Sequence, residues 1–140
     1  MSARPAFIVI DTNVLISAGL LPRSRMARLV ALAVANFVIA QNEATWEELI
    51  SRIEREKFDR YFGDDGRLKF MSGLAQLVQF FDSVATVQVS RDPDDDKFIG
   101  LAMDARASLI VSGDADLQDL RSYQGISIVS PSAFLEQFDT

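Results

Sequence analysis

Acidic side chains stand at three points where an apolar run of the sequence ends. Asp11 follows the first run, the aspartates at 94–96 come after the third, and Asp114 follows the fourth. If these runs are strands of a parallel sheet, the carboxylates meet at its carboxyl edge, where open α/β sheets bind ligands. Carboxylates held together repel one another, and a divalent cation relieves that repulsion. The spacing therefore predicts a metal site, which Glu48 can join from a helix beside the first strand.

Taken one at a time, the same acids have purely structural explanations. Each aspartate stands where it could cap a helix or belong to its first turn, and both positions favour a carboxylate. Glu48 could be an exposed helix charge next to Glu47. Their coincidence at successive strand ends favours one shared site over several unrelated caps.

The 140-residue chain contains no histidine and no cysteine. This composition excludes disulfides, thiolate nucleophiles and sulfur-ligated metals, and it removes the commonest general base and metal ligand. An enzyme built from this chain would rely on carboxylates, lysine, hydroxyls, backbone dipoles and hard cations bound through oxygen. Mg²⁺ and Mn²⁺ are the cations that suit such ligands.

The formal net charge of −6 argues against nonspecific binding of nucleic acid, which needs a basic surface. The acid is nevertheless concentrated in the second half of the chain. The first half holds two basic clusters, which are Arg23, Arg25 and Arg28, and then Arg52, Arg55, Lys57 and Arg60. These clusters are either solvated helix faces or a basic surface beside an acidic pocket.

Strand-like and helix-like patterns alternate along the sequence. Strands are expected at residues 6–10, 37–40, 84–89, 109–111 and 126–129. Helices are expected at 14–20, 24–35, from Asn42 to about Arg55, around 68–81, after Pro93 and from Pro131. Since parallel strands need crossover helices, this order predicts a three-layer α/β fold with a central, mainly parallel five-stranded sheet flanked by helices. The length suits one domain spanning residues 1–140.

Several motifs resemble, in order and over essentially the whole chain, the PIN-domain ribonucleases. The motifs are "VIDTNVLISAGL", "EELISRIEREKF", "RDPDDDKFIGLAMDARASLIVSGDADLQDL" and "ISIVSPSAFLEQF". The likeness is to the group that forms the toxin component of toxin-antitoxin pairs. It implies a PIN-like fold and a metal-dependent nuclease.

The resemblance implies an acidic quartet that binds the metal. Its members would be Asp11, Glu48, Asp96 and Asp114. Asp96 is chosen among the three consecutive aspartates because the family's acid precedes an apolar helix by the interval seen in "DKFIGLA". Asp94 and Asp95 are then expected to cap the helix and to face solvent.

Four further residues would support this quartet. Thr12, Asn13 and Ser112 would orient the carboxylates as hydrogen-bond donors, and Asp116 would be an accessory acid. Glu56 stands where relatives often have proline, which is a minor departure in a loop.

The activity expected from the resemblance is hydrolysis of RNA phosphodiester bonds with Mg²⁺ or Mn²⁺. A bound metal would activate a water molecule, polarise the scissile phosphate and stabilise the leaving oxygen. The resemblance also implies a cognate antitoxin and a homodimer. The sequence shows no apolar stretch of membrane-spanning length and no secretory signal, so a cytoplasmic protein with no membrane partner is expected.

Three other functions are compatible with parts of the pattern. A haloacid-dehalogenase-like phosphatase could use Asp11 as its nucleophile, but Asn13 stands where that chemistry needs a second aspartate. A receiver-like signalling domain would need a lysine near the end of the fifth strand, where none is present. A non-catalytic binding module would keep the fold for association alone.

Overall fold

The computed structural model describes residues 6–139, which build one six-stranded sheet. The strand order is β3-β2-β1-β4-β6-β5, and all neighbours are parallel except β5, which runs antiparallel to β6. The strands are β1 (Phe7–Ile10), β2 (Val38–Gln41), β3 (Val78–Phe80), β4 (Leu109–Val111), β5 (Ser122–Tyr123) and β6 (Ile126–Val129). The expected three-layer, mainly parallel α/β fold is confirmed, with six strands in place of five.

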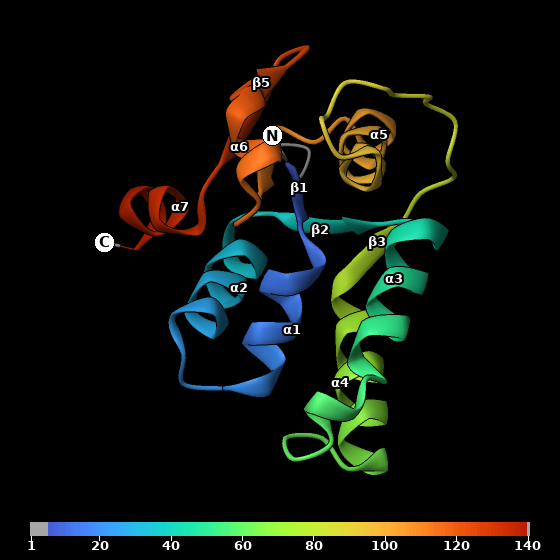
Figure 1. The fold of residues 1–140 in the computed structure, drawn as a ribbon. Coiled ribbons are helices and arrows are strands. Elements are labelled where there is room, and N and C mark those ends of the chain that lie inside the picture. The colour runs from blue at the N-terminus through green and yellow to red at the C-terminus, as the bar shows by residue number, and fades with distance from the viewer. Residues whose placement is uncertain (1–5, 140) are drawn as a thin grey trace.

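Helices cover both faces of the sheet (Figure 1). The α-helices are α1 (Thr12–Leu20), α2 (Arg25–Asn36), α3 (Glu43–Ile53), α4 (Asp64–Leu77), α5 (Asp96–Ala105), α6 (Ala115–Leu120) and α7 (Pro131–Phe138). Two short 3-10 helices, η1 (Glu56–Phe58) and η2 (Pro93–Asp95), precede α4 and α5. One face packs against α1 to α4 and α7, and the other packs against α5 and α6.

The central strand β1 shows how the sequence creates these two cores. Ile8 and Ile10 point into the core under α1 and α2, whereas Val9 points into the core under α5. All three side chains are fully buried, as the unbroken apolar run of β1 requires. Because Ile10 pairs with Val111 of β4, the residues that follow these two strands emerge side by side.

The prediction of a strand at residues 84–89 is wrong. This stretch alternates apolar and polar residues, but it runs as an irregular segment along α5 and leaves Val84 81% exposed. Two α5 carboxylates bind its N–H groups in place of a neighbouring strand. Asp104 accepts from Val84 and Ala85, each at 3.0 Å, and Asp96 accepts from residues 89 and 90.

The third strand instead begins where the expected helix at 68–81 breaks off. Helix α4 ends at Leu77, and Val78 to Phe80 pair with β2. Leu74, Val78 and Phe81 have helical spacing, so the periodicity alone does not reveal the change from helix to strand. Within residues 6–139, no helix combines the length and apolar character that crossing a membrane requires.

Candidate metal centre

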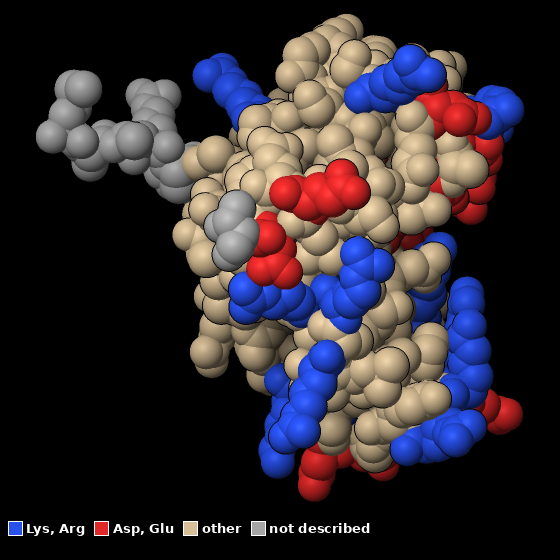
Figure 2. Space-filling view, turned by 90° about the vertical axis from the view of Figure 1, so that its left-hand side faces the viewer, with Lys and Arg blue, Asp and Glu red and all other residues tan. Residues whose placement is uncertain are grey.

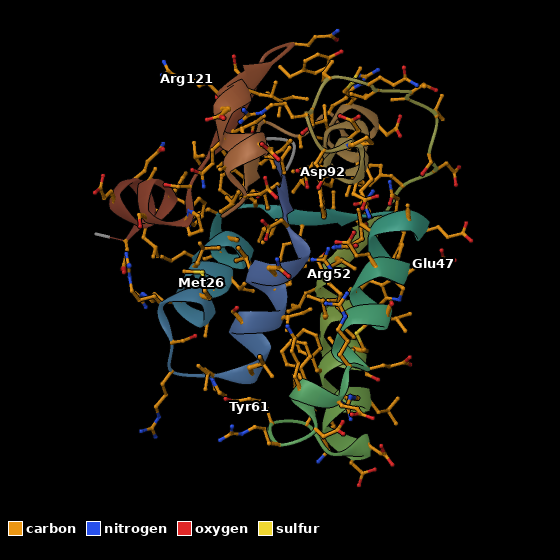
Figure 3. The ribbon with its side chains drawn as sticks, in the orientation of Figure 1. Met26, Glu47, Arg52, Tyr61, Asp92 and Arg121 are labelled. Atoms are coloured by element: carbon orange, nitrogen blue, oxygen red, sulfur yellow. The ribbon has the colours of Figure 1, made fainter. Side chains whose placement is uncertain are left out.

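An acidic pocket of about 510 Å³ opens at the carboxyl edge of the central strands. Arg52 of α3 lies on one side of it, Asp92 lies on the other side, just before η2, and Met26 of α2 lines a third part (Figure 3). Six carboxylates line the pocket: those of Asp11, Glu48, Asp92, Asp94, Asp95 and Asp114. The sheet edge therefore gathers the acids, as the strand-end spacing predicts.

Asp11 ends β1 and caps α1. Its Oδ1 accepts a hydrogen bond from the Val14 N–H at 2.9 Å. Its Oδ2 accepts from the Ser112 hydroxyl and from the Gly113 N–H, the latter at 3.1 Å. Burial raises the pKa of Asp11, and these hydrogen bonds offset only part of the increase. Capping and pocket lining thus coincide in one residue, so the two explanations offered by the sequence are compatible.

Ser112 joins the ends of β1 and β4. Its hydroxyl donates to Asp11 and accepts from the Asp114 N–H at 3.0 Å. Asp114 in turn caps α6 by accepting from the Asp116 N–H at 2.7 Å. Ser112 is fully buried, and its hydroxyl thus connects the Asp11 carboxylate to the backbone of Asp114.

Asp95 is the acid that completes the far wall of the pocket. Carboxylate oxygens of Asp95, Asp114 and Asp116 lie within 4.8 Å of one another. Asp95 is only 8% exposed, and its Oδ2 has no hydrogen-bond partner among the described residues. Burial, followed by the charges of Asp114 and Asp92, raises the pKa of Asp95 to about 7.

The structure does not bring Asp96 into this pocket, in contrast to the choice made from the sequence. Its Oδ1 accepts from the N–H groups of Val89 at 3.2 Å and Ser90 at 2.8 Å, and it lines a separate hollow. Asp95 does not cap α5 with its side chain, and it does not face solvent. The acid that faces the pocket is thus the residue immediately before "DKFIGLA", and not the aspartate that opens this motif. We therefore place Asp95 in the candidate site instead of Asp96.

Glu48 reaches the opposite wall of the pocket from α3. Its Oε2 accepts from the Lys97 ammonium, and its Oε1 lies 3.4 Å from Nη2 of Arg52. Burial by itself raises the pKa of Glu48, but Lys97, the Thr12 hydroxyl and Arg52 together outweigh burial, and the net pKa lies below its usual value. Glu48 is therefore held as a carboxylate.

The two residues that follow Asp11 have different surroundings. Thr12 is buried beside Glu48, in keeping with a supporting role. Asn13 is exposed, and its Oδ1 accepts from Nη1 of Arg52 at 2.9 Å. Asn13 thus contacts a cation, whereas the resemblance implies that it orients a carboxylate.

Residues 7–116 match the family described as the PIN domain. The chain belongs to the PIN-domain family. It is also 28% identical over 142 residues to the uncharacterized protein MJ1680 of Methanocaldococcus jannaschii, covering 94% of this chain and 91% of that protein.

Two solved structures share the fold of this PIN domain. VapBC2 from Rickettsia felis, bound to a DNA fragment from its promoter, gives a TM-score of 0.62 at 11% identity, with 89% of this chain and 98% of that chain covered. DNA-bound VapBC from Salmonella typhimurium gives a TM-score of 0.59 at 16% identity, with 90% and 98% covered. At these identities the likeness concerns the fold.

The donor set of the PIN domain suits a hard divalent cation. The cluster of Asp95, Asp114 and Asp116 offers carboxylate oxygens alone, which are the ligands that Mg²⁺ and Mn²⁺ accept. The unpartnered, buried Oδ2 of Asp95 is a polar atom that a cation would satisfy. The residues present therefore fit such an ion.

Three cations of this PIN domain contact acids of the pocket and of the adjoining aspartate cluster, a role that the sequence pattern does not predict. Arg52 and Lys97 bind Glu48, while Arg91 lies 3.0 Å from Asp116. The i, i+4 spacing of Glu48 and Arg52 is a signal that could have identified the first pair. Lys97 and Arg91 depend on tertiary contacts that no local spacing reveals.

Proposed function

We propose that this PIN domain is a ribonuclease that hydrolyses phosphodiester bonds with Mg²⁺ or Mn²⁺. The observation that carries the proposal is the buried, unpartnered carboxylate of Asp95 within 4.8 Å of Asp114 and Asp116. A cation held there would act as a Lewis acid on the scissile phosphate and lower the pKa of a water molecule. No histidine or cysteine is needed for this chemistry, which fits the composition.

The roles of the chain's own residues follow from their contacts. Asp95 and Asp114, assisted by Asp116, would hold the cation. Asp11 is bound through both oxygens, so it would fix the position of Ser112 and Asp114 and add negative charge behind them. That saturation also weighs against Asp11 as the nucleophile of a phosphatase, since a nucleophilic oxygen must be free to attack.

RNA would approach over a basic surface next to the acidic pocket. In Figure 2, Lys and Arg side chains gather over the lower half of the molecule, and a group of Asp and Glu lies above them at the right edge. The exposed basic residues of α2, of the turn before it and of the segment around η1 are Arg23, Arg25, Arg28, Arg55, Lys57 and Arg60. Arg52 lies at the pocket itself, where it could bind the phosphate next to the scissile one.

The same fold suggests a place in a toxin-antitoxin pair. The two solved relatives are VapBC proteins bound to DNA, and the fold likeness covers about nine-tenths of this chain. We propose that this chain acts as the toxin of such a pair in the cytoplasm, forms a homodimer and is inhibited by a cognate antitoxin protein.

The test compares two neighbouring aspartates that differ in placement. Asp95→Asn should lose Mn²⁺ binding in calorimetry and lower RNA cleavage by at least about a hundredfold, because a metal ligand is removed. Asp96→Asn is the matched control, since its amide oxygen can still accept from Val89 and Ser90. It should bind Mn²⁺ and cleave RNA like the wild type.

Other results would favour other functions. A wild-type protein that binds no Mn²⁺ would contradict the nuclease and support a non-catalytic binding module. Metal-dependent hydrolysis of p-nitrophenyl phosphate that Asp11→Asn abolishes would support a phosphatase. Equal loss of binding in Asp95→Asn and Asp96→Asn would contradict the assignment of Asp95.

A further inference from the structure

The Glu48 side of the pocket and the aspartate side differ in how many cations offset their negative charge. Glu48 lies against two cations: its Oε2 accepts from Lys97, and its Oε1, which has no hydrogen-bond partner among the described residues, lies 3.4 Å from Nη2 of Arg52. The Glu48 side chain is 11% exposed and that of Lys97 is 24% exposed, so water screens this pair only in part.

The aspartate wall has much less compensation. Among the described residues, Arg91 is the cation paired there, and it divides its charge between Asp116 and Asp119 on an exposed surface. Asp95 has no cation partner among the described ion pairs. The field in the pocket therefore attracts a divalent cation to Asp95 and Asp114 more strongly than to Glu48.

The uncompensated acid Asp95 and the cation Lys97 both lie at the start of α5. Asp95 immediately precedes α5, and Lys97 is the second residue of that helix. Residues two apart at the start of a helix do not share a face. The start of α5 therefore places an acid in the pocket and an ammonium group against Glu48, from the side of the neighbouring hollow that Lys97 and Asp96 line.

We propose that Lys97 is a resident counter-cation that holds Glu48 in place and keeps it from coordinating the metal directly. This inference rests on the proposed function, since it assumes a metal at the aspartate wall. Lys97 is then a positioning residue, which orders Glu48 and limits the negative charge that the metal experiences. Its removal should change metal affinity and cleavage in opposite directions.

The experiment is a calorimetric Mn²⁺ titration of the wild type and four variants. In Lys97→Met the Glu48 carboxylate loses its ammonium partner and is released toward the metal, so Mn²⁺ should bind roughly tenfold more tightly. Lys97→Gln, which keeps a polar side chain if Lys97→Met fails to fold, should show the same direction. Lys97→Arg should retain the wild-type affinity, and so should Lys69→Met, an exposed lysine of α4 that serves as control.

Cleavage and stability separate positioning from simple packing. At saturating Mn²⁺, kcat for RNA should fall in Lys97→Met with little change in KM, and Lys97→Arg should restore kcat. If Lys97 only packed the fold, Lys97→Met would unfold at lower urea without metal, yet its affinity for Mn²⁺ would not rise. Unchanged or weaker binding by folded Lys97→Met and Lys97→Gln would overturn the inference while leaving the nuclease intact. A wild type that binds no Mn²⁺ would overturn both.

Discussion

Asp11 and Asp95 line the same pocket but reach it by different routes. Asp11 comes directly after β1, next to the end of β4, and the register of Ile10 with Val111 fixes its position. Asp95 follows a long irregular segment, residues 81–92, and its position depends on how that segment lies along α5.

The two carboxylates also differ in how the fold compensates them. Asp11 accepts three hydrogen bonds, whereas Oδ2 of Asp95 has no partner among the described residues. Burial raises the pKa of both, and the pKa of Asp95 reaches about 7. Asp11 therefore stabilises the fold through its hydrogen bonds. The charged form of Asp95 destabilises the fold, and a bound cation would remove that destabilisation.

The largest effect on stability is expected at Asp11. Asp11→Ala leaves the Val14 N–H, the Ser112 hydroxyl and the Gly113 N–H without their acceptor. We expect the free energy of unfolding to fall by about 2–4 kcal/mol, because buried donors left unsatisfied are costly. Urea unfolding without metal measures it, with Asp11→Asn as the milder control that keeps one acceptor. Equal stability of Asp11→Ala and the wild type would show that this network contributes nothing.

Replacing Asp95 should change the free energy of unfolding in the opposite direction. Its folded pKa of about 7 lies above the ordinary value of 3.8, so the folded state binds a proton more tightly than the unfolded chain. The stability gained from that proton is complete below pH 4 and is lost as the pH rises through 7. Asp95→Asn avoids this loss, and without metal it should be about 1–3 kcal/mol more stable than the wild type at pH 8.

The measurement is urea unfolding of metal-free protein at pH 5 and pH 8. The advantage of Asp95→Asn should shrink at pH 5, where wild-type Asp95 is largely protonated. Added Mn²⁺ should raise the melting temperature of the wild type and leave Asp95→Asn unchanged, because ligands stabilise the state that binds them. A variant less stable than the wild type at pH 8 would show that Asp95 is not an uncompensated charge.

The same contrast explains how far the sequence could predict the site. Asp11, Ser112 and Asp114 follow apolar runs that form adjacent parallel strands, and the ends of such runs can be located from the sequence pattern. The choice between Asp95 and Asp96 could not be made this way. One residue of shift around the start of a helix turns a side chain by about 100°, and which of the two faces the pocket depends on tertiary contacts.

The segment before Asp95 was mispredicted for a related physical reason. Its alternation of Val84, Val87 and Val89 with polar residues is typical of a strand, but a strand also needs a partner for its backbone. Here Val78 to Phe80 occupy the edge of β2, and α5 carboxylates accept the N–H groups of the later residues. Side chains of α5, the helix that follows this segment in the chain, thus take the role that local propensity assigns to a neighbouring strand.

The smallest expected effects concern the two aspartates that hold this segment to α5. Asp104→Ala should release the N–H groups of Val84 and Ala85, and Asp96→Ala should release those of Val89 and Ser90. Each change should cost about 1 kcal/mol of local stability, since the contacts are partly exposed to water that can replace them. The rate of hydrogen exchange should rise at Val84 and Ala85 in Asp104→Ala, and at Val89 and Ser90 in Asp96→Ala.

Of these two variants, only Asp96→Ala should affect metal binding in the pocket. Asp96 adjoins Asp95, so freeing residues 89 and 90 should let the Asp95 carboxylate vary in position and weaken Mn²⁺ binding severalfold, whereas Asp104→Ala should bind Mn²⁺ like the wild type. Unlike Asp96→Asn, which keeps an acceptor, Asp96→Ala isolates the hydrogen bonds themselves. If both alanine variants weakened Mn²⁺ binding equally, the whole segment would position Asp95; if neither did, Asp95 would owe its place to η2 and its contacts within the pocket.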